Sequence, residues 1–226
     1  MWTKEELLKW QNDEEFQLEQ IRQDGYNIQY IRNPTEEMCL KAVKEDEYSI
    51  KFIYNPTEEM CLEAVKQNGY SIQYIHSPSE KMCLEAIKEN NYSFQYIYNP
   101  TEKVCLEAVK QDGSSIKYIY NPTEKVCLEA VKQDETNIRY IHNPTEEMCL
   151  EAVRKNGICI QYIHNPSEKV CLGAIRQNGH SIKYIHNPTK EMCLEALNFI
   201  NYDDIIRHID IEKYPELYEK YYFMNT

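Results

Sequence analysis

An Asn-Pro or Ser-Pro pair recurs every 22 residues through most of this 226-residue chain. The pairs begin, without any insertion, at Asn33, Asn55, Ser77, Asn99, Asn121, Asn143, Asn165 and Asn187. A repeat of this length is typical of solenoid proteins, in which one short unit cannot bury its own apolar face and is stabilised by stacking on its neighbours. The period therefore predicts one tandem array rather than a conventional globular domain.

The array is expected to have three parts. Residues 1–10 form an N-terminal lead-in that caps the first repeat, residues 11–208 form nine repeats of one solenoid, and residues 209–226 form a Tyr-rich C-terminal cap. The first repeat lacks the proline, and the ninth, 187–208, is only half regular. A second period of 88 residues, visible as Ser79 and Ser167 in place of Thr, indicates duplication of a four-repeat block and carries no functional prediction.

The first half of each repeat predicts an α-helix. In the repeat that begins at Asn33, Asn33 is a candidate N-cap, Pro34 fits the first helical turn and Glu36 stands at the third position. In the repeat 55–76, "NPTEEMCLEAVKQNGYSIQYIH", the apolar residues cover an arc of roughly 200° at ~100° per residue. Gly69 suits the left-handed residue that follows many helices.

The second half of the repeat, "YSIQYIH", allows two interpretations. A short second helix is favoured because Ser71 is a good cap and Ile72 and Ile75 are spaced as one side of a helical turn. The alternative is a strand, in which Tyr70, Ile72 and Tyr74 alternate, and this would give a β/α horseshoe. The prediction is an all-α protein, an α-solenoid of about nine helix–turn–short-helix repeats.

Eight of the nine cysteines share one column of the repeat, and Cys159 stands apart. The column is Cys39, Cys61, Cys83, Cys105, Cys127, Cys149, Cys171 and Cys193. Helices that pack ~8–10 Å apart would hold equivalent cysteines beyond the ~7 Å between Cα atoms that a disulfide tolerates. No C-x-x-C pair is present, and the N-terminus has no apolar segment typical of a secretory signal. The cysteines are predicted to be small core residues, with no metal or cofactor.

A column of tyrosines and histidines directly before the Asn-Pro pair is the candidate binding site. Its members are Tyr54, His76, Tyr98, Tyr120, His142, His164 and His186. The favoured interpretation is that these rings cover the joint between the helices of each repeat. The alternative is a protein-binding stripe, whose histidines would make association pH-sensitive near neutrality. A second aromatic column is expected to pack between repeats: Tyr30, Phe52, Tyr74, Tyr96, Tyr118, Tyr140, Tyr162 and Tyr184.

Charge and motifs narrow the classes of function. The net charge of −12 disfavours nucleic acid as a partner, because a phosphate backbone would be repelled on average. No apolar run is long enough to span a membrane. The chain also lacks a Gly-rich phosphate loop, H-E-x-x-H and a nucleophile elbow, and it is predicted not to be an enzyme.

The segments "NPTEEMCLEAVKQNG" and "SIQYIHNP" resemble short repeats in proteins of unknown function from mimiviruses and related giant viruses of amoebae. The resemblance covers about residues 11–197 and implies a protein made in the cytoplasm of an infected host cell, or a virion component. The resulting hypothesis is a non-catalytic scaffold that binds another protein, with basic partners favoured by its charge. The alternatives are a self-assembling structural component and, with less support, an acidic mimic of nucleic acid.

Overall fold

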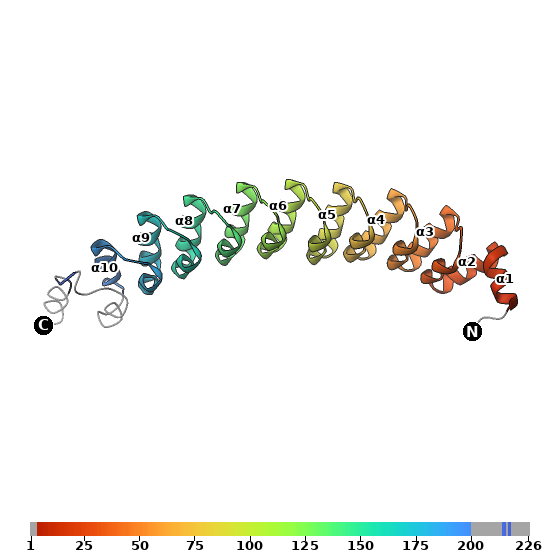
Figure 1. Ribbon diagram of the computed structural model, residues 1–226, viewed down its shortest axis with the longest axis horizontal. Coiled ribbons are helices and arrows are strands. Elements are labelled where there is room, and N and C mark those ends of the chain that lie inside the picture. Colours follow the sequence, from red (N-terminus) through yellow and green to blue (C-terminus); the bar gives the residue numbers. More distant parts are fainter. Residues whose placement is uncertain (1–3, 200–213, 216, 218–226) are drawn as a thin grey trace. The chain divides into compact units, whose positions relative to one another are not determined.

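The computed structural model describes residues 4–199, 214, 215 and 217. The chain divides into two compact units, Met1–Gln111 and Asp112–Thr226, and each is described by itself. In both units every described element is helical, and a longer α-helix alternates with a six-residue 3₁₀-helix, labelled η (Figure 1). The all-α prediction is confirmed, and the β/α alternative is wrong because the described residues contain no strand.

The helices follow the 22-residue period. The first unit contains α1 (Lys4–Asn12), α2 (Glu14–Gln23), η1 (Gly25–Tyr30), α3 (Glu36–Glu45), η2 (Glu47–Phe52), α4 (Glu58–Gln67), η3 (Gly69–Tyr74), α5 (Glu80–Glu89), η4 (Asn91–Tyr96) and α6 (Glu102–Gln111). The second contains η5 (Gly113–Tyr118), α7 (Glu124–Gln133), η6 (Glu135–Tyr140), α8 (Glu146–Lys155), η7 (Gly157–Tyr162), α9 (Glu168–Gln177), η8 (Gly179–Tyr184) and α10 (Lys190–Ala196).

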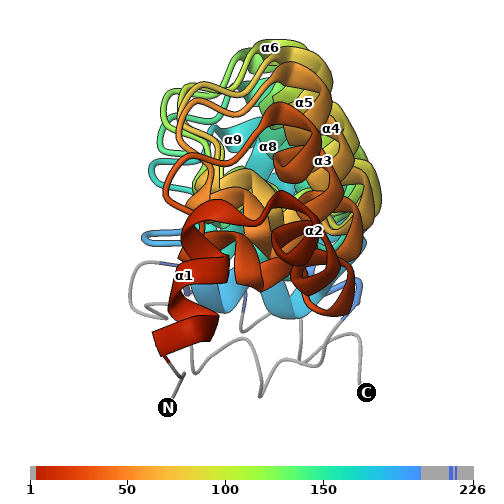
Figure 2. The same cartoon turned by 90° about the vertical axis from the view of Figure 1, so that its right-hand side faces the viewer.

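Within each unit the repeats stack in two layers. Inside one unit, successive η-helices contact each other, an η-helix contacts the α-helices before and after it, and α-helices of adjacent repeats contact each other. Seen from the α1 end, α3, α4 and α5 of the first unit lie one behind another (Figure 2). This is the nearest-neighbour stacking that defines an α-solenoid.

The predicted apolar columns form the core between the two layers. In the repeat 55–76, Met60, Cys61, Ala64, Val65 and Ile72 are buried, and the equivalent residues of the other regular repeats are buried as well. The Ala of the third of these columns has no exposed surface in any of the repeats that contain it, because the adjacent repeat packs against this face of the helix. The burial of one face per helix therefore depends on the adjacent repeats.

The predicted N-cap is wrong by two residues. Each regular α-helix is capped by Thr or Ser, as at Thr57, whose hydroxyl oxygen accepts a hydrogen bond from the Met60 N–H. At five repeats the Asn of the Asn-Pro pair instead forms a turn with positive φ, of 53° at Asn55 and 50° at Asn165. Asn tolerates this left-handed conformation better than most residues, so the Asn-Pro pair turns the chain and leaves the capping to the next residue.

The predicted end of the α-helix and the predicted second cap are also wrong. No described glycine has a positive φ, so Gly69 is not a left-handed cap. The α-helix ends at Asn68 in an extended conformation, and the Asn68 side chain accepts a hydrogen bond from the Tyr70 N–H at 3.0 Å. One residue therefore ends α4 and caps η3, whereas Ser71, the predicted cap, is buried inside the repeat.

Glycine is needed at position 69 because the next repeat approaches its backbone closely, and not because the backbone has a positive φ there. A Cβ added to Gly69 would lie 2.4 Å from the backbone oxygen of Ala86 in the next repeat and 2.6 Å from the Ser93 hydroxyl. Gly173 is different, because its added Cβ would meet only Val153 and Leu150 side chains at 3.5 and 3.8 Å, which is ordinary contact. The two glycines lie at different places in the repeat, and only one is constrained by its neighbour.

We therefore expect Gly69→Ala and Gly173→Ala to have opposite effects on the free energy of unfolding. Gly69→Ala should destabilise the protein by about 1–3 kcal/mol, since the added methyl forces the adjacent backbone away. Gly173→Ala should stabilise it by about 0.5–1 kcal/mol, because alanine is the better residue inside a helix. Urea unfolding of both variants checks this, and equal signs would contradict the close-approach argument.

The chain ends depart from the repeat where caps were predicted. α1 extends past residue 10 to Asn12, and its Trp10 side chain is buried against the rings of Phe16 and Tyr30. In the predicted C-terminal cap, Leu217 is buried and the Tyr214 hydroxyl donates a hydrogen bond to the Pro188 carbonyl at 3.2 Å. Residues 209–213, 216 and 218–226 of the cap, and 200–208 of the ninth repeat, lie outside the described residues.

Candidate functional site

The tyrosine and histidine column is exposed along both units. We call it the His/Tyr row: Tyr54, His76 and Tyr98 in the first unit, and Tyr120, His142, His164 and His186 in the second. Tyr54, Tyr98 and Tyr120 are 91%, 93% and 92% exposed, so their rings cover no joint between helices. The favoured interpretation from the sequence is therefore wrong, and these side chains project into solvent.

The backbone around the row explains this projection. In the repeat 55–76, Ile75 follows η3 in an extended conformation with φ −98°, and its side chain is buried. His76 is the next residue, so its side chain points to the opposite side of the extended segment, away from the core. At five repeats an Asn with positive φ then turns the chain into the next α-helix. The side chains of the row therefore point outward because the residue before each is an Ile that is buried or half-buried and, in these five repeats, the residue after it turns the chain.

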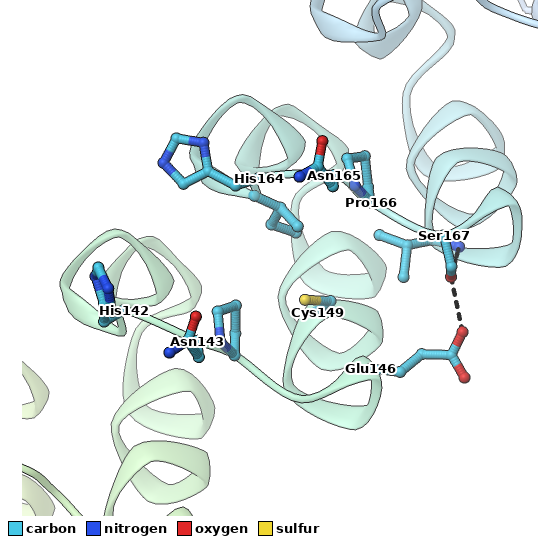
Figure 3. Close-up of a pocket in the computed structure, with 11 residues that line it drawn as sticks. His142, Asn143, Glu146, Cys149, His164, Asn165, Pro166 and Ser167 are labelled. Atoms are coloured by element: carbon cyan, nitrogen blue, oxygen red, sulfur yellow. Dashed lines mark hydrogen bonds between the residues drawn. The ribbon is translucent and has the colours of Figure 1, made fainter.

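In the second unit two members of the row border one pocket. This pocket of about 340 Å³ is lined by His142 and His164, by the Asn143-Pro144 and Asn165-Pro166 turns, by Glu146, Cys149, Ile163 and Val170, and by Ser167 (Figure 3). The two imidazoles lie at one end of the pocket and the hydrogen-bonded Glu146 and Ser167 at the other (Figure 3). The structure thus brings His142 and His164 to the same site.

The first unit contains the equivalent pocket. It measures about 420 Å³ and is lined by Asn55, Pro56, Glu58, Cys61, Ile75, His76, Ser77, Ser79 and Met82. Each of its nine lining residues has a counterpart 88 residues later in the second pocket, which His142 and Pro166 line in addition. Both pockets lie at a repeat whose cap is Ser rather than Thr. The 88-residue period, which carried no functional prediction, therefore coincides with a duplicated pocket.

Carboxylates at the first position of the α-helices link neighbouring repeats. The Ser167 hydroxyl donates to Glu146 at 2.7 Å, and Lys169 lies 3.8 Å from the same carboxylate. In the first unit the Thr101 hydroxyl and the Lys103 ammonium donate to Glu80 at 2.7 and 3.0 Å. The Thr101 hydrogen bond, followed by the Lys103 interactions, lowers the pKa of Glu80. These contacts favour the charged form of Glu80, which holds its helix to the next repeat.

The cysteines are buried, as predicted. All nine lie in the core, including Cys149 in the pocket wall, and none of them forms a disulfide. Burial, followed by the charge of the Glu three residues earlier in the helix, raises the pKa of the Cys149 thiol. Within the described part of the chain, no three His, Cys, Asp or Glu side chains converge in a group that could hold a metal ion.

Sequence reasoning missed a set of ring pairs on the η-helices of the first unit. Each pair joins a Tyr at the second position of one η-helix to a Phe or Tyr at the last position of the next. The pairs are Tyr26–Phe52 at 5.5 Å, Tyr48–Tyr74 at 6.0 Å and Tyr70–Tyr96 at 6.0 Å between ring centroids, all edge to face. The second aromatic column thus contacts the neighbouring repeat here, as predicted, but Phe52, Tyr74 and Tyr96 remain more than a third exposed.

One of these pairs holds a cation. The Lys51 ammonium lies 4.5 Å from the Tyr26 ring centroid and 4.8 Å from that of Phe52, and it donates to the Tyr26 hydroxyl at 3.1 Å. This hydrogen bond is the main cause that raises the pKa of Lys51, and Asp46 contributes a smaller favourable charge. A ring pair of this geometry can therefore bind an ammonium group.

The second unit does not continue the pairs. Ser114, Thr136 and Ile158 stand where the first unit has Tyr. Its cations lie over single rings instead, with Lys117, Arg139 and Lys183 each less than 5 Å from the centroid of the tyrosine that follows it. The ring pairs therefore distinguish the two units, although their pockets are equivalent.

The architecture and the exposed row define the described chain as an α-solenoid repeat protein. The model of the family described as "Domain of unknown function (DUF4116)" matches residues 35–79, 57–100, 123–166 and 145–188, more than half of the chain in total, and the chain belongs to this family. Comparison with curated proteins and with solved structures found no match. None of the described helices has the length and apolar composition that crossing a membrane requires.

Proposed function

We propose that this protein is a non-catalytic scaffold that binds another protein through the His/Tyr row and the pockets beside it. One observation carries the proposal: Tyr54, Tyr98 and Tyr120 are more than nine-tenths exposed, so the fold does not need their rings. Tyrosine is enriched at protein interfaces because it combines a large apolar ring with a hydrogen-bonding tip.

The pockets support the same use. Each lies at the joint between two repeats and offers amide, imidazole and carboxylate groups beside buried apolar side chains. A volume of a few hundred Å³ suits single side chains of a partner, which would enter the pocket while the row contacts the partner's surface. A repeat array presents such elements at regular intervals, which is how solenoids build extended binding surfaces.

The cellular setting belongs to the proposal too. The resemblance to repeats of giant viruses supports a protein that acts in the cytoplasm of an infected host cell. Membership of a family of unknown function adds the repeat architecture but no activity. The absence of catalytic motifs from the sequence supports a binding role over an enzymatic one.

The row is tested by changing Tyr54, Tyr98 and Tyr120 to Ser together. Protein partners captured by the tagged full chain from infected host cells should be lost, with at least tenfold less recovered. The free energy of unfolding should change by less than about 0.5 kcal/mol per site, because exposed side chains without contacts contribute little to stability. Quantitative mass spectrometry of the captured proteins and urea unfolding provide the two measurements.

A matched control changes three exposed glutamines outside the row. Gln23, Gln111 and Gln133 are exposed and each donates to a Glu on its own helix, so Gln→Ser at all three should leave capture unchanged. Equal recovery with the row variant and the wild type would remove the row as the site. A strictly reproducible absence of any partner, together with growth of the particle in light scattering at increasing concentration, would favour self-assembly instead.

A further inference from the structure

We infer that the Tyr48–Tyr74 and Tyr70–Tyr96 ring pairs of the first unit are binding sites for Lys or Arg side chains of a basic partner segment. This inference names a surface other than the His/Tyr row and does not depend on it. The pairs are spaced one repeat apart on successive η-helices, so one extended basic segment would engage both.

The neighbouring repeat provides the template. In the Tyr26–Phe52 pair the cation is the chain's own Lys51, which precedes Phe52 in η2. The residues equivalent to Lys51 are Gln73 and Gln95 in the other two pairs. An edge-to-face ring pair is therefore present three times, and among the described residues only the Tyr26–Phe52 pair receives a cation from the chain itself.

The two glutamines do not substitute for the lysine. The Gln73 side-chain amide donates to the Tyr70 carbonyl at 3.0 Å, and that of Gln95 donates to the Tyr92 carbonyl at 3.0 Å. Both amides are thus bound to their own η-helix. The rings of Tyr74 and Tyr96 meanwhile keep more than a third of their surface exposed, which leaves them accessible to a side chain from outside.

Charge selects a basic occupant. The chain carries 37 Asp and Glu against 25 Lys and Arg. At the Tyr48–Tyr74 pair, the Asn68 amide donates both to the Tyr48 hydroxyl at 2.8 Å and to Glu47 at 3.0 Å, so a carboxylate lies beside the first ring. The residue equivalent to Glu47 at the Tyr70–Tyr96 pair is Gly69. A ring and a nearby carboxylate both attract a cation, and the two attractions add. The Tyr48–Tyr74 pair should therefore bind a Lys or Arg side chain more tightly than the Tyr70–Tyr96 pair does.

The test uses the full chain and an octalysine peptide in isothermal titration calorimetry. The double variant Gln73→Lys with Gln95→Lys should place a lysine of the chain itself on each ring pair, as Lys51 does on the Tyr26–Phe52 pair. Binding of octalysine should then weaken at least fivefold, since each cation–ring site contributes a factor of about two to five to the affinity. Gln73→Lys alone should weaken binding more than Gln95→Lys alone. Lys51→Gln should strengthen binding, because it opens the third pair.

The controls separate the ring pairs from general charge. Gln23→Lys with Gln111→Lys adds the same two charges to exposed α-helix positions of the same unit, and should change the dissociation constant less than twofold. An octalysine peptide acetylated on every side chain should bind at least fivefold more weakly than octalysine. Circular dichroism of each variant should match the wild type.

Two results would overturn the inference. One is equal weakening by the two lysine-adding variants, which would mean that octalysine responds only to net charge. The other is equal affinity for the acetylated peptide, which would mean that the surface binds apolar stems rather than cations. Tyr54→Ser with Tyr98→Ser should leave octalysine binding unchanged, so failure here and failure of the His/Tyr row are distinguishable.

Discussion

Replacement of Trp10 by Ala is expected to lower the free energy of unfolding of the N-terminal repeats by about 3–5 kcal/mol, the usual range for losing a buried Trp. Trp10 is 5% exposed and its ring lies 5.4 Å from that of Phe16 and 5.6 Å from that of Tyr30. It lies on α1, which packs against α2 of the first repeat where the other repeats pack against a repeat. Loss of the ring therefore exposes a surface that stacking covers elsewhere.

The distribution of the loss matters as much as its size. Because each repeat contacts only its neighbours, the effect should fall mainly on α2 and η1 and fade along the array. Hydrogen exchange should show faster exchange in residues 14–30 of Trp10→Ala and nearly unchanged exchange in α8 and α9.

Leu8→Ala is the matched control for this variant. Leu8 lies on the same helix but is 52% exposed, so its loss should cost less than about 1 kcal/mol. Unchanged protection of residues 14–30 in Trp10→Ala would show that α1 does not cap the array.

The sequence was sufficient for the architecture because the architecture depends on a repeated apolar pattern. Met60, Cys61, Ala64 and Val65 recur at helical spacing, and burial at those columns follows from the pattern alone. A strict period also requires each repeat to meet its neighbours in the same way, which predicts stacking. These properties average over many residues, so no single misjudged position alters them.

Local boundaries could not be predicted because several residues suited the same role. Asn55 and Thr57 are both good helix caps, and only the structure shows that Asn takes the positive φ while Thr accepts the hydrogen bond. Asn68 and Ser71 compete in the same way for the second helix. Propensity ranks such residues almost equally, so the outcome depends on the path of the backbone.

The sequence revealed only part of the candidate site, because the recurrence of a residue in each repeat does not indicate whether its side chain points to the core or to solvent. Tyr54 and Tyr74 belong to neighbouring columns of similar composition, yet one is in solvent and the other contacts a ring of the preceding repeat. The ring pairs join residues 26 apart, one repeat plus four, and this separation has meaning only once the stacking geometry is known. The repeat of Tyr26, Tyr48 and Tyr70 was the available signal.

The stability of the protein should fall steeply above pH 9 because of its buried thiols. Burial, with smaller contributions from Glu135 and Asp134, raises the pKa of Cys159 from 9.0 to about 11. A raised pKa means that the folded state keeps its proton where the unfolded state loses it. The stabilisation is therefore complete below pH 9 and is lost as the pH rises through 11.

For Cys159 alone the loss is about 3 kcal/mol, since each pKa unit corresponds to about 1.4 kcal/mol. Cys159 is 1% exposed, so solvent screens this effect little. The other thiols whose pKa is raised act in the same direction: Cys39, Cys61, Cys83, Cys105, Cys127, Cys149 and Cys171.

Cys159→Ser isolates the contribution of one thiol, because Ser is the residue at this column in most repeats. The hydroxyls of Ser49, Ser71, Ser93 and Ser181 have no hydrogen-bond partner among the described residues, so the new hydroxyl should cost about 1 kcal/mol at pH 7. Above pH 9 the wild type loses the thiol's stabilisation and the variant does not. The order of stability should therefore reverse between pH 9 and 11.

Urea unfolding with a reducing agent, at each pH from 7 to 11, measures both chains. Every other titratable group is common to the two chains and cancels in the difference. Ser71→Cys provides the mirror experiment, since it places a thiol at the equivalent site of the first unit and should add alkaline sensitivity. Parallel stability curves for the wild type and Cys159→Ser would show that burial does not hold the thiol neutral, and would contradict the placement of Cys159 in the core.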